Sequence, residues 1–194
     1  MQAIDVLMTR RSASALTEPA PDEGALQLIF ASAVRAPDHG RLRPWRFIVV
    51  RGAGRARFGE LLADCLRRTQ PAASPQALAR ERDKALRAPL IVVVAAHCNP
   101  AVVKVPPLEQ ALSAGAAAAN IMLASVALGF NAMWKTGGAA YDETVKRALG
   151  LDPADAIVGF LYLGTEAARA ATPLRGEWRD LVREWPAGGQ AGAP

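Results

Sequence analysis

A long run without a charged side chain, from Ala111 to Trp134, constrains the fold of this chain more than any other feature. A run of this length can cross a bilayer as a helix. However, it consists mainly of Ala, Gly and Ser, includes Asn120, and has no aromatic residue where it begins. We therefore expect a helix that is buried in a core or an interface and that stops at Gly129, a residue type favoured after a helix C-terminus.

The segments around this helix alternate between helical and extended patterns. Pro89 to Val94 is a continuous apolar run, which fits a central strand buried on both faces. Asp22 is a typical N-cap at the start of a helix, and Pro37 follows the end of that helix. Helices are expected over residues 3–9, 23–34, 55–68, 75–87 and 142–149, and strands over residues 46–50, 89–94, 130–134 and 156–163. The alternation indicates an α/β or α+β class with a central sheet.

Length and composition describe one globular domain over residues 1–194. The chain has 194 residues, of which 51% are hydrophobic and 21% charged, so it can bury a core without a disulfide or a metal. Its two cysteines, Cys65 and Cys98, are far apart and lack any metal-ligand spacing, which suits a reducing cytosol. We see no signal-peptide pattern. The expectation is a cytoplasmic protein with no membrane span and no bound metal.

The formal net charge of +5 raises the question of nucleic-acid binding. The arginines occur in pairs along the whole chain, and no nucleic-acid-binding motif accompanies them. Aromatic residues make up only 6%, which is few for a base-stacking surface. A solvated, arginine-rich surface explains the charge better, and nucleic-acid binding stays a remote alternative.

Two guanidinium groups and two hydroxyls lie within the five residues from Arg10 to Ser14 (Arg-Arg-Ser-Ala-Ser). On spacing alone, the favoured interpretation is a helix end, where arginines complement the helix dipole and Ser12 begins the exit turn. The alternative is a phosphate clamp, because arginine makes bidentate contacts to phosphate oxygens and a serine hydroxyl adds a neutral donor. The residues alone leave both interpretations open.

A second segment, from Arg35 to His39 (Arg-Ala-Pro-Asp-His), leads through Pro44-Trp45 into an apolar strand. Its simplest interpretation is a helix end followed by a turn. A Ser/His/Asp enzyme would need His39 or His97, the two histidines of the chain, and no nucleophile-elbow pattern supports one. An arginine and a histidine around a proline-fixed turn also fit one side of a site for a phosphorylated, flat ligand.

A third segment, from Trp134 to Gly138 (Trp-Lys-Thr-Gly-Gly), follows an expected strand. One interpretation is a strand end with a glycine turn. The other is a ligand site, because paired glycines let backbone N–H groups approach a planar ligand closely. Lys135 would then add positive charge beside an anionic ring. Glycine-rich loops of the Rossmann and P-loop types are absent from the sequence.

Taken in order, these segments resemble the flavin-dependent nitroreductase family, and within it the minimal, short-chain YdjA-like branch of NAD(P)H nitroreductases. Lys104-Val105-Pro106 and the stretch from Val158 to Thr165 add to the resemblance, which covers nearly the whole chain. It implies an α+β fold of three layers, α-β-α, with a central mixed or antiparallel sheet. It also implies an intertwined homodimer with one FMN per subunit at the interface, in which residues 165–194 form an arm that packs on the partner subunit.

The resemblance also implies which residues bind the cofactors. Arg10, Arg11 and Ser12 would grip the FMN phosphate, and Arg35 and His39 would approach the same FMN from the partner subunit. The ring edge would lie along Trp134, Lys135 and Thr136. The nicotinamide nucleotide would touch the end of the long helix at Ala124, Ser125, Val126, Ala127, Leu128 and Gly129. No catalytic side chain is implied, because the chemistry takes place on the flavin.

The chain departs from the wider family at several positions. Many relatives carry serine-rich residues and a Gln before Pro-Trp, where this chain has Asp38-His39 and Arg43. Lys135-Thr136 stands where Arg-Ser is expected in the close branch, and lysine lacks the bidentate fork. The region between Val94 and Leu108 is short, so substrate-pocket helices of larger members are expected to be absent. These departures affect the substrate range more than FMN binding.

The implied function is an NAD(P)H-driven, ping-pong reduction of a small-molecule electron acceptor, such as a nitroaromatic or a quinone, through N5 of FMN. A non-catalytic flavin-binding or sensing protein on the same fold is the alternative.

Overall fold

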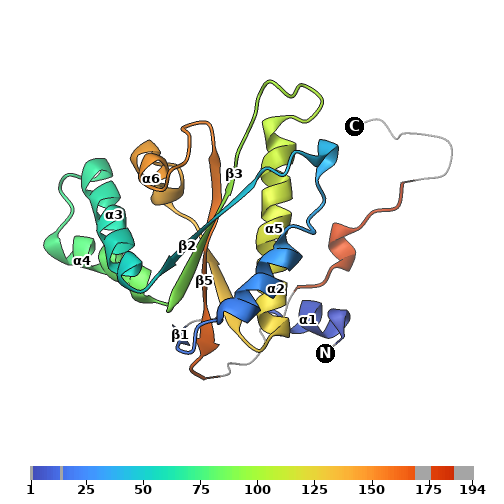
Figure 1. Cartoon of the computed structure of the whole chain (residues 1–194), viewed down its shortest axis with the longest axis horizontal. Helices are drawn as coiled ribbons and strands as arrows, with labels where there is room; N and C mark the ends of the chain where they lie inside the picture. The colour runs from blue at the N-terminus through green and yellow to red at the C-terminus, as the bar shows by residue number, and fades with distance from the viewer. Residues whose placement is uncertain (1, 14, 169–175, 186–194) are drawn as a thin grey trace.

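A five-stranded antiparallel sheet forms the centre of the computed structural model, which is described for residues 2–13, 15–168 and 176–185 (Figure 1). The strands are β1 (Leu16–Thr17), β2 (Trp45–Arg51), β3 (Leu90–Ala96), β4 (Asn131–Lys135) and β5 (Ala156–Glu166). Their order is β1-β5-β3-β2, and β4 pairs with β5. Every strand pair is antiparallel, and one parallel bridge joins Ser12 to Ala132.

Helices cover both faces of this sheet, which makes three layers (Figure 1). One face packs against α3 (Ala53–Thr69) and α6 (Glu143–Ala148), with α4 (Pro75–Asp83) on α3. The other face packs against α2 (Glu23–Ala33) and α5 (Pro107–Ala127), with α1 (Ala3–Thr9) beside α5. Short 3-10 helices complete the chain at η1 (His39–Arg41), η2 (Lys84–Leu86), η3 (Gly138–Ala140) and η4 (Arg179–Leu181). The predicted α+β class and α-β-α layering are confirmed.

Strand β3 is the centre of the fold. All seven of its residues are buried, because β2 and β5 flank it and helices cover both of its faces. Its continuous apolar run predicted this position, and the strand extends two residues further than expected, to Ala96. One irregularity in its pairing with β5 falls between Val94 and Ala95.

The uncharged run folds as α5 and β4. Among the described residues, α5 is the one helix with the length and composition to cross a membrane. Its small residues, such as Ala114 and Ala118, and Ile121 pack fully buried against the sheet and α2, as expected for a core helix. Leu128 caps its C-terminus, and Gly129 adopts a φ of 88°, which is a left-handed conformation that glycine tolerates.

Strand β1 was not anticipated from the sequence. It has two residues, and it pairs with the end of β5 through Leu16 opposite Glu166 and Thr17 opposite Thr165. The Thr165 hydroxyl also donates to the carbonyl of Pro19 at 2.8 Å. The N-terminal segment is thus fastened to the last strand of the sheet.

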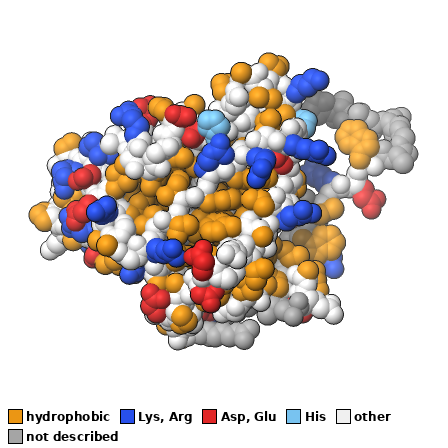
Figure 2. Space-filling model, viewed as in Figure 1, with side chains coloured by type: hydrophobic (Ala, Val, Ile, Leu, Met, Phe, Trp, Pro, Cys, Tyr) orange, Lys and Arg blue, Asp and Glu red, His pale blue; other side chains and the backbone are white. Residues whose placement is uncertain are grey.

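Apolar side chains remain exposed on α1, α2 and α5. The exposed fraction is 57% for Ile4, 55% for Leu7, 57% for Leu28 and 63% for Leu112. Figure 2 shows hydrophobic side chains over much of the face in view, among Lys and Arg side chains. Exposed apolar side chains that gather on neighbouring helices suit contact with another protein surface.

Only part of the expected C-terminal arm is described. Residues 165–168 finish β5 and the bend after it, and residues 176–185 contain η4. In the second part, Trp178 is 60% exposed and Trp185 is 94% exposed. The remaining residues of the arm lie outside the described part of the chain, so its packing on a partner stays a prediction.

Candidate functional site

A small cavity of about 180 Å³ opens at the C-terminal end of β4. Two of the predicted site residues, Lys135 and Thr136, line it. The other lining residues are Leu62, Glu81, Lys84, Arg87, Gly137, Gly138, Ala139, Phe160 and Tyr162. Gly137 has a φ of 121°, and neither Gly137 nor Gly138 has an atom within 4 Å of where a Cβ would lie. The glycine pair therefore keeps the backbone at this wall open to a ligand.

The charge of the cavity is positive. Lys84, Arg87 and Lys135 contribute three cations against the carboxylate of Glu81, which forms an ion pair with Lys84. Arg87 and Lys135 have no ion-pair partner among the residues that the structure describes. Cations at one small opening favour a ligand that is an anion or becomes one.

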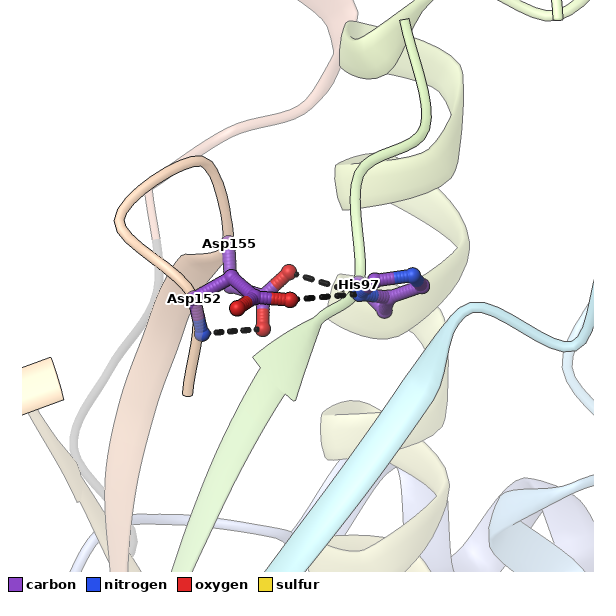
Figure 3. Close-up of side chains that lie close together, drawn as sticks. All are labelled: His97, Asp152 and Asp155. Carbon is purple, nitrogen blue, oxygen red and sulfur yellow. Dashed lines mark hydrogen bonds and ion pairs between the residues drawn. The ribbon is translucent and has the colours of Figure 1, made fainter. Parts of the chain in front are cut away.

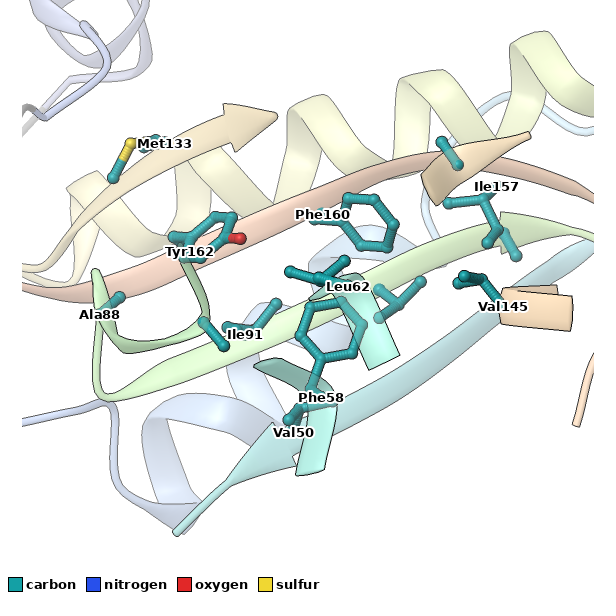
Figure 4. Close-up of a cluster of buried hydrophobic side chains, with 14 of the residues drawn as sticks. Val50, Phe58, Leu62, Ala88, Ile91, Met133, Val145, Ile157, Phe160 and Tyr162 are labelled. Atoms are coloured by element: carbon teal, nitrogen blue, oxygen red, sulfur yellow. The ribbon is translucent and has the colours of Figure 1, made fainter. Parts of the chain in front are cut away.

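The floor of the cavity is mostly apolar. It consists of Phe160 and Tyr162 from β5 and Leu62 from α3, which lie together on the α3 face of the sheet (Figure 4). Only 2% of Tyr162 is exposed, and burial raises the pKa of its hydroxyl to about 12. An apolar floor next to Lys84, Arg87 and Lys135 fits a ligand with an apolar body and a polar edge.

Sequence reasoning missed Lys84, Arg87 and Tyr162. The two cations lie in and just after η2, about 50 positions before Lys135, and they belong to a run that reads as an exposed, charged helix. Tyr162 lies in an apolar strand, where an aromatic residue is ordinary core material. The one signal in the sequence that could have marked Tyr162 as a site residue was its polar hydroxyl within an apolar strand.

Arg10 and Arg11 have different surroundings. The expectation was that both side chains would grip a phosphate. Arg11 makes a bidentate ion pair with Glu166, with both N–O distances at 2.5 Å. The two side chains are only 9% and 13% exposed, and the Asn131 amide donates to the same carboxylate at 3.2 Å. Arg10 has no side-chain hydrogen bond among the described residues. The guanidinium of Arg11 is thus already occupied within its own chain, and that of Arg10 is available.

Strand β4 links this segment to the cavity. The bridge between Ser12 and Ala132, with the Ala13 N–H donating to the Ala132 carbonyl at 3.2 Å, holds Ser12 beside the start of β4. Lys135 and Thr136 lie at the other end of the strand. At about 3.3 Å per residue, the two ends are roughly 10–13 Å apart. The structure therefore places the first and third segments along one strand.

Trp134 and Lys135 point to opposite faces of the sheet, as successive strand residues do. The Trp134 indole lies over Gly159, where an added Cβ would be 2.2 Å from Nε1, and Nε1 donates to the carbonyl of Val158 at 3.3 Å. Its side chain packs with the α5 face. Trp134 does not line the cavity, so a ligand there would not meet its ring.

Arg35 and His39 lie on the opposite side of the sheet, next to α5. The Nδ1 atom of exposed His39 is 2.6 Å from Oε2 of Glu109, near the start of α5. Arg35 lines an open groove of about 380 Å³ between α1, α2 and α5, together with Ala124 and Ala127. Within one chain, the structure does not bring Arg35 or His39 to the cavity.

The helix end predicted to contact NAD(P)H is only partly accessible. Ser125 is fully buried, and its hydroxyl donates to the carbonyl of Ile121 at 2.7 Å. Its side chain therefore cannot touch a nucleotide without opening the core. The other members of the predicted set are half-buried or exposed, namely Ala124, Val126, Ala127, Leu128 and Gly129.

A second polar cluster joins His97, Asp152 and Asp155 (Figure 3). The Nδ1 atom of His97 is 2.9 Å from Oδ1 of Asp155 and 4.0 Å from Oδ2 of Asp152. The other oxygen of Asp155, a carboxylate only 5% exposed, accepts the Asp152 N–H at 3.0 Å. These bonds satisfy a buried carboxylate and tie the end of β3 to the start of β5. Among the described residues neither histidine is hydrogen-bonded to a serine or cysteine, which disfavours a Ser/His/Asp site.

Comparison with known proteins identifies the family. Residues 7–165 match the model of the nitroreductase family. The protein named "Putative NAD(P)H nitroreductase YdjA" of Escherichia coli strain K12 is 41% identical over 174 residues, which are 90% of this chain and 93% of that protein.

Two solved structures share the fold. A nitroreductase-like family protein from Bacillus cereus has a TM-score of 0.81 at 22% identity, over 97% of each chain. A protein from Desulfovibrio desulfuricans described as a "putative nitroreductase in complex with FMN" has a TM-score of 0.73 at 24% identity, over 96% of this chain and 98% of that one. The chain belongs to the nitroreductase family of oxidoreductases.

Proposed function

We propose that the chain is an FMN-dependent oxidoreductase that takes electrons from NAD(P)H and passes them, in ping-pong turnover, to a nitroaromatic, a quinone or a related acceptor. The observation that carries this proposal is the cationic cavity with an apolar floor at the end of β4. Membership of the nitroreductase family and similarity to a structure in complex with FMN support the choice of cofactor.

The residues present fit the two polar ends of FMN. At the start of β4, the guanidinium of Arg10 and the hydroxyl of Ser12 form a donor set suited to a phosphate. At the end of β4, Lys135, Thr136 and the glycine pair 137–138 line the opening that would take the ring edge. Arg11 has a supporting role in this proposal, because its bond to Glu166 holds the segment that carries Arg10 and Ser12.

When bound, FMN would supply the transfer of an electron pair between the nicotinamide and the acceptor. The protein would contribute electrostatics and exclusion of water. Lys84, Arg87 and Lys135 would stabilise negative charge on the reduced ring, and Phe160 and Leu62 would keep the floor beneath it dry. No side chain needs to act as an acid or a base, so none is assigned a catalytic role.

The proposed working unit is a cytoplasmic homodimer with one FMN per subunit at the interface. Arg35 and His39 are far from the cavity of their own chain, and a second subunit would supply them. The exposed apolar side chains of α1, α2 and α5 support such an interface. Thr165 and Glu166 of the predicted arm 165–194 pair with β1 of their own chain, and the residues that follow would pack on the partner and cover the exposed Trp178. NAD(P)H would approach the accessible residues of the α5 end, Ala124 and Val126 to Gly129.

Freshly purified protein tests this proposal. It should be yellow, bleach when NAD(P)H is added without oxygen, and regain its colour with a nitroaromatic. Arg87→Gln should weaken FMN binding, and Arg57→Gln, at an exposed arginine of α3 outside the cavity, should not. Protein that takes up no FMN would refute the proposal. Yellow protein that NAD(P)H does not reduce would indicate a flavin-binding or sensing protein instead.

A further inference from the structure

The cavity at the end of β4 contains a polar group that the fold itself does not use. Tyr162 is 98% buried, and its hydroxyl has no hydrogen-bond partner among the described residues. The hydroxyl oxygen is open to the cavity, where water can hydrate it, and a ligand that displaces this water has to replace the hydrogen bond. The Tyr162 hydroxyl is therefore available to a ligand in the cavity.

Its position in the sheet aims Tyr162 at the ligand. Tyr162 pairs with Met133 in β4, two residues before Lys135, and its side chain shares the α3 face with Phe160 and Leu62 (Figure 4). The same residue lines the opening that Lys84, Arg87 and Lys135 surround. The unpaired hydroxyl thus belongs to the wall of a cationic cavity.

The protonation state of Tyr162 makes it a donor. The pKa of its hydroxyl is raised to about 12. Burial is the largest cause, while Arg87 lowers the pKa and Glu81 raises it. The phenol therefore keeps its proton throughout the neutral range, and it can donate one hydrogen bond at every pH where an oxidoreductase of this kind would work.

We propose that the Tyr162 hydroxyl is a positioning residue that donates a hydrogen bond to an acceptor atom, a carbonyl oxygen or a ring nitrogen, at the edge of the bound flavin. This inference rests on the proposed FMN site and goes beyond it, because it assigns the floor of that site a polar function. A hydrogen bond to a charged acceptor is stronger than one to a neutral acceptor, so the hydroxyl favours the reduced, anionic ring. Tyr162 thereby raises the reduction potential of the flavin.

The two tyrosines of the chain allow a matched experiment. Tyr162→Phe removes the buried hydroxyl, and Tyr141→Phe removes a hydroxyl on a residue that is 77% exposed and outside the cavity. The measurements are the melting temperature of the apo-protein, the FMN dissociation constant, and the two-electron midpoint potential of the FMN-loaded protein. A 13C label on tyrosine Cζ reports directly on each hydroxyl when FMN is added.

In the apo-protein, Tyr162→Phe should melt no lower than wild type, because no partner within the chain is lost. Oxidised FMN should bind several-fold more weakly, and reduced FMN about tenfold more weakly again, which corresponds to a midpoint potential about 30 mV more negative. The Cζ resonance of Tyr162 should shift when FMN binds, and that of Tyr141 should not. Tyr141→Phe should match wild type in every measurement.

The outcomes separate this inference from the proposed function. If wild type binds FMN, but Tyr162→Phe keeps its affinity and its potential, the inference about Tyr162 is wrong and the FMN site stands. A lower apo-protein melting temperature for Tyr162→Phe, with unchanged FMN properties, would show a structural hydroxyl and overturn the inference. If wild type binds no FMN at all, both the proposed function and this inference fail.

Discussion

The two neighbouring arginines at the end of α1 should respond very differently to removal. Arg11→Ala leaves the Glu166 carboxylate, which is only 13% exposed, without its bidentate partner. Removing one member of a buried ion pair costs about 3–5 kcal/mol, and because both side chains keep some exposure we expect about 3 kcal/mol. For a chain of this length that loss lowers the melting temperature by about 6–12 °C.

Arg10→Ala is the matched control for the stability of the apo-protein, and it also tests whether Arg10 binds the FMN phosphate. Its side chain has no hydrogen bond among the described residues, so the apo-protein should keep its free energy of unfolding within about 0.5 kcal/mol. A charge-assisted bond to phosphate contributes about 1.5–3 kcal/mol, so FMN affinity should fall about 10- to 100-fold.

Thermal melts and urea titrations of the apo-proteins, followed by FMN titrations of each variant, measure both effects. If Arg11→Ala has the same melting temperature as wild type, the ion pair to Glu166 does not hold the N-terminal segment. If Arg11→Ala keeps its stability and loses FMN, while Arg10→Ala keeps FMN, the roles assigned to the two arginines are reversed.

Three further substitutions probe other parts of the fold. Gly159→Ala places a Cβ 2.2 Å from Nε1 of Trp134, so it should cost at least about 1–3 kcal/mol and change tryptophan fluorescence; an unchanged melting curve would contradict the close packing. Asp155→Ala removes the acceptor of the His97 ring and of a backbone N–H, and a urea titration should show a loss of about 1–3 kcal/mol. Asp142→Asn should destabilise at neutral pH, with the difference from wild type vanishing in acid. Desolvation alone would raise the pKa of Asp142, but the Val145 N–H and Arg68 outweigh it, so the pKa is lowered in the folded protein. The carboxylate therefore stabilises the fold at pH values above its unfolded-state pKa. This stabilisation is lost as the pH falls through the folded-state pKa. If Asp142→Asn lowers the free energy of unfolding by the same amount at neutral and at acid pH, this reasoning is refuted.

Sequence patterns predicted the regular elements well where the signal is local. The N-cap Asp22 accepts the Ala25 N–H at 2.8 Å, and α5 ends at Ala127, just before Leu128 and the Gly129 at which it was expected to stop. Both depend on residues within one or two helical turns. Strand β1 was missed because two residues carry no periodicity, and its pairing depends on Thr165 and Glu166, which are almost 150 positions away.

The candidate site was only half predictable for a related reason. The sequence gives no sign that Lys84 and Arg87 meet Lys135, because the sheet and η2 bring them together from distant segments. The equivalence assumed for Arg10 and Arg11 was also beyond local reasoning. Adjacent residues leave a helix end in different directions, and only the position of Glu166 decides which guanidinium is neutralised.

Fastening the N-terminal segment to β5 has a consequence for the order of events when the protein is made. Arg11 and Glu166 are 155 positions apart, and β5 also provides Phe160 and Tyr162. Contacts between such distant residues form slowly, because a long loop must close before they stabilise the chain. A ribosome therefore synthesises the N-terminal segment early, but the segment gains these contacts only after β5 has been made. Until β5 has been translated, the nascent chain lacks both the partner of Arg11 and two of the side chains that line the cavity.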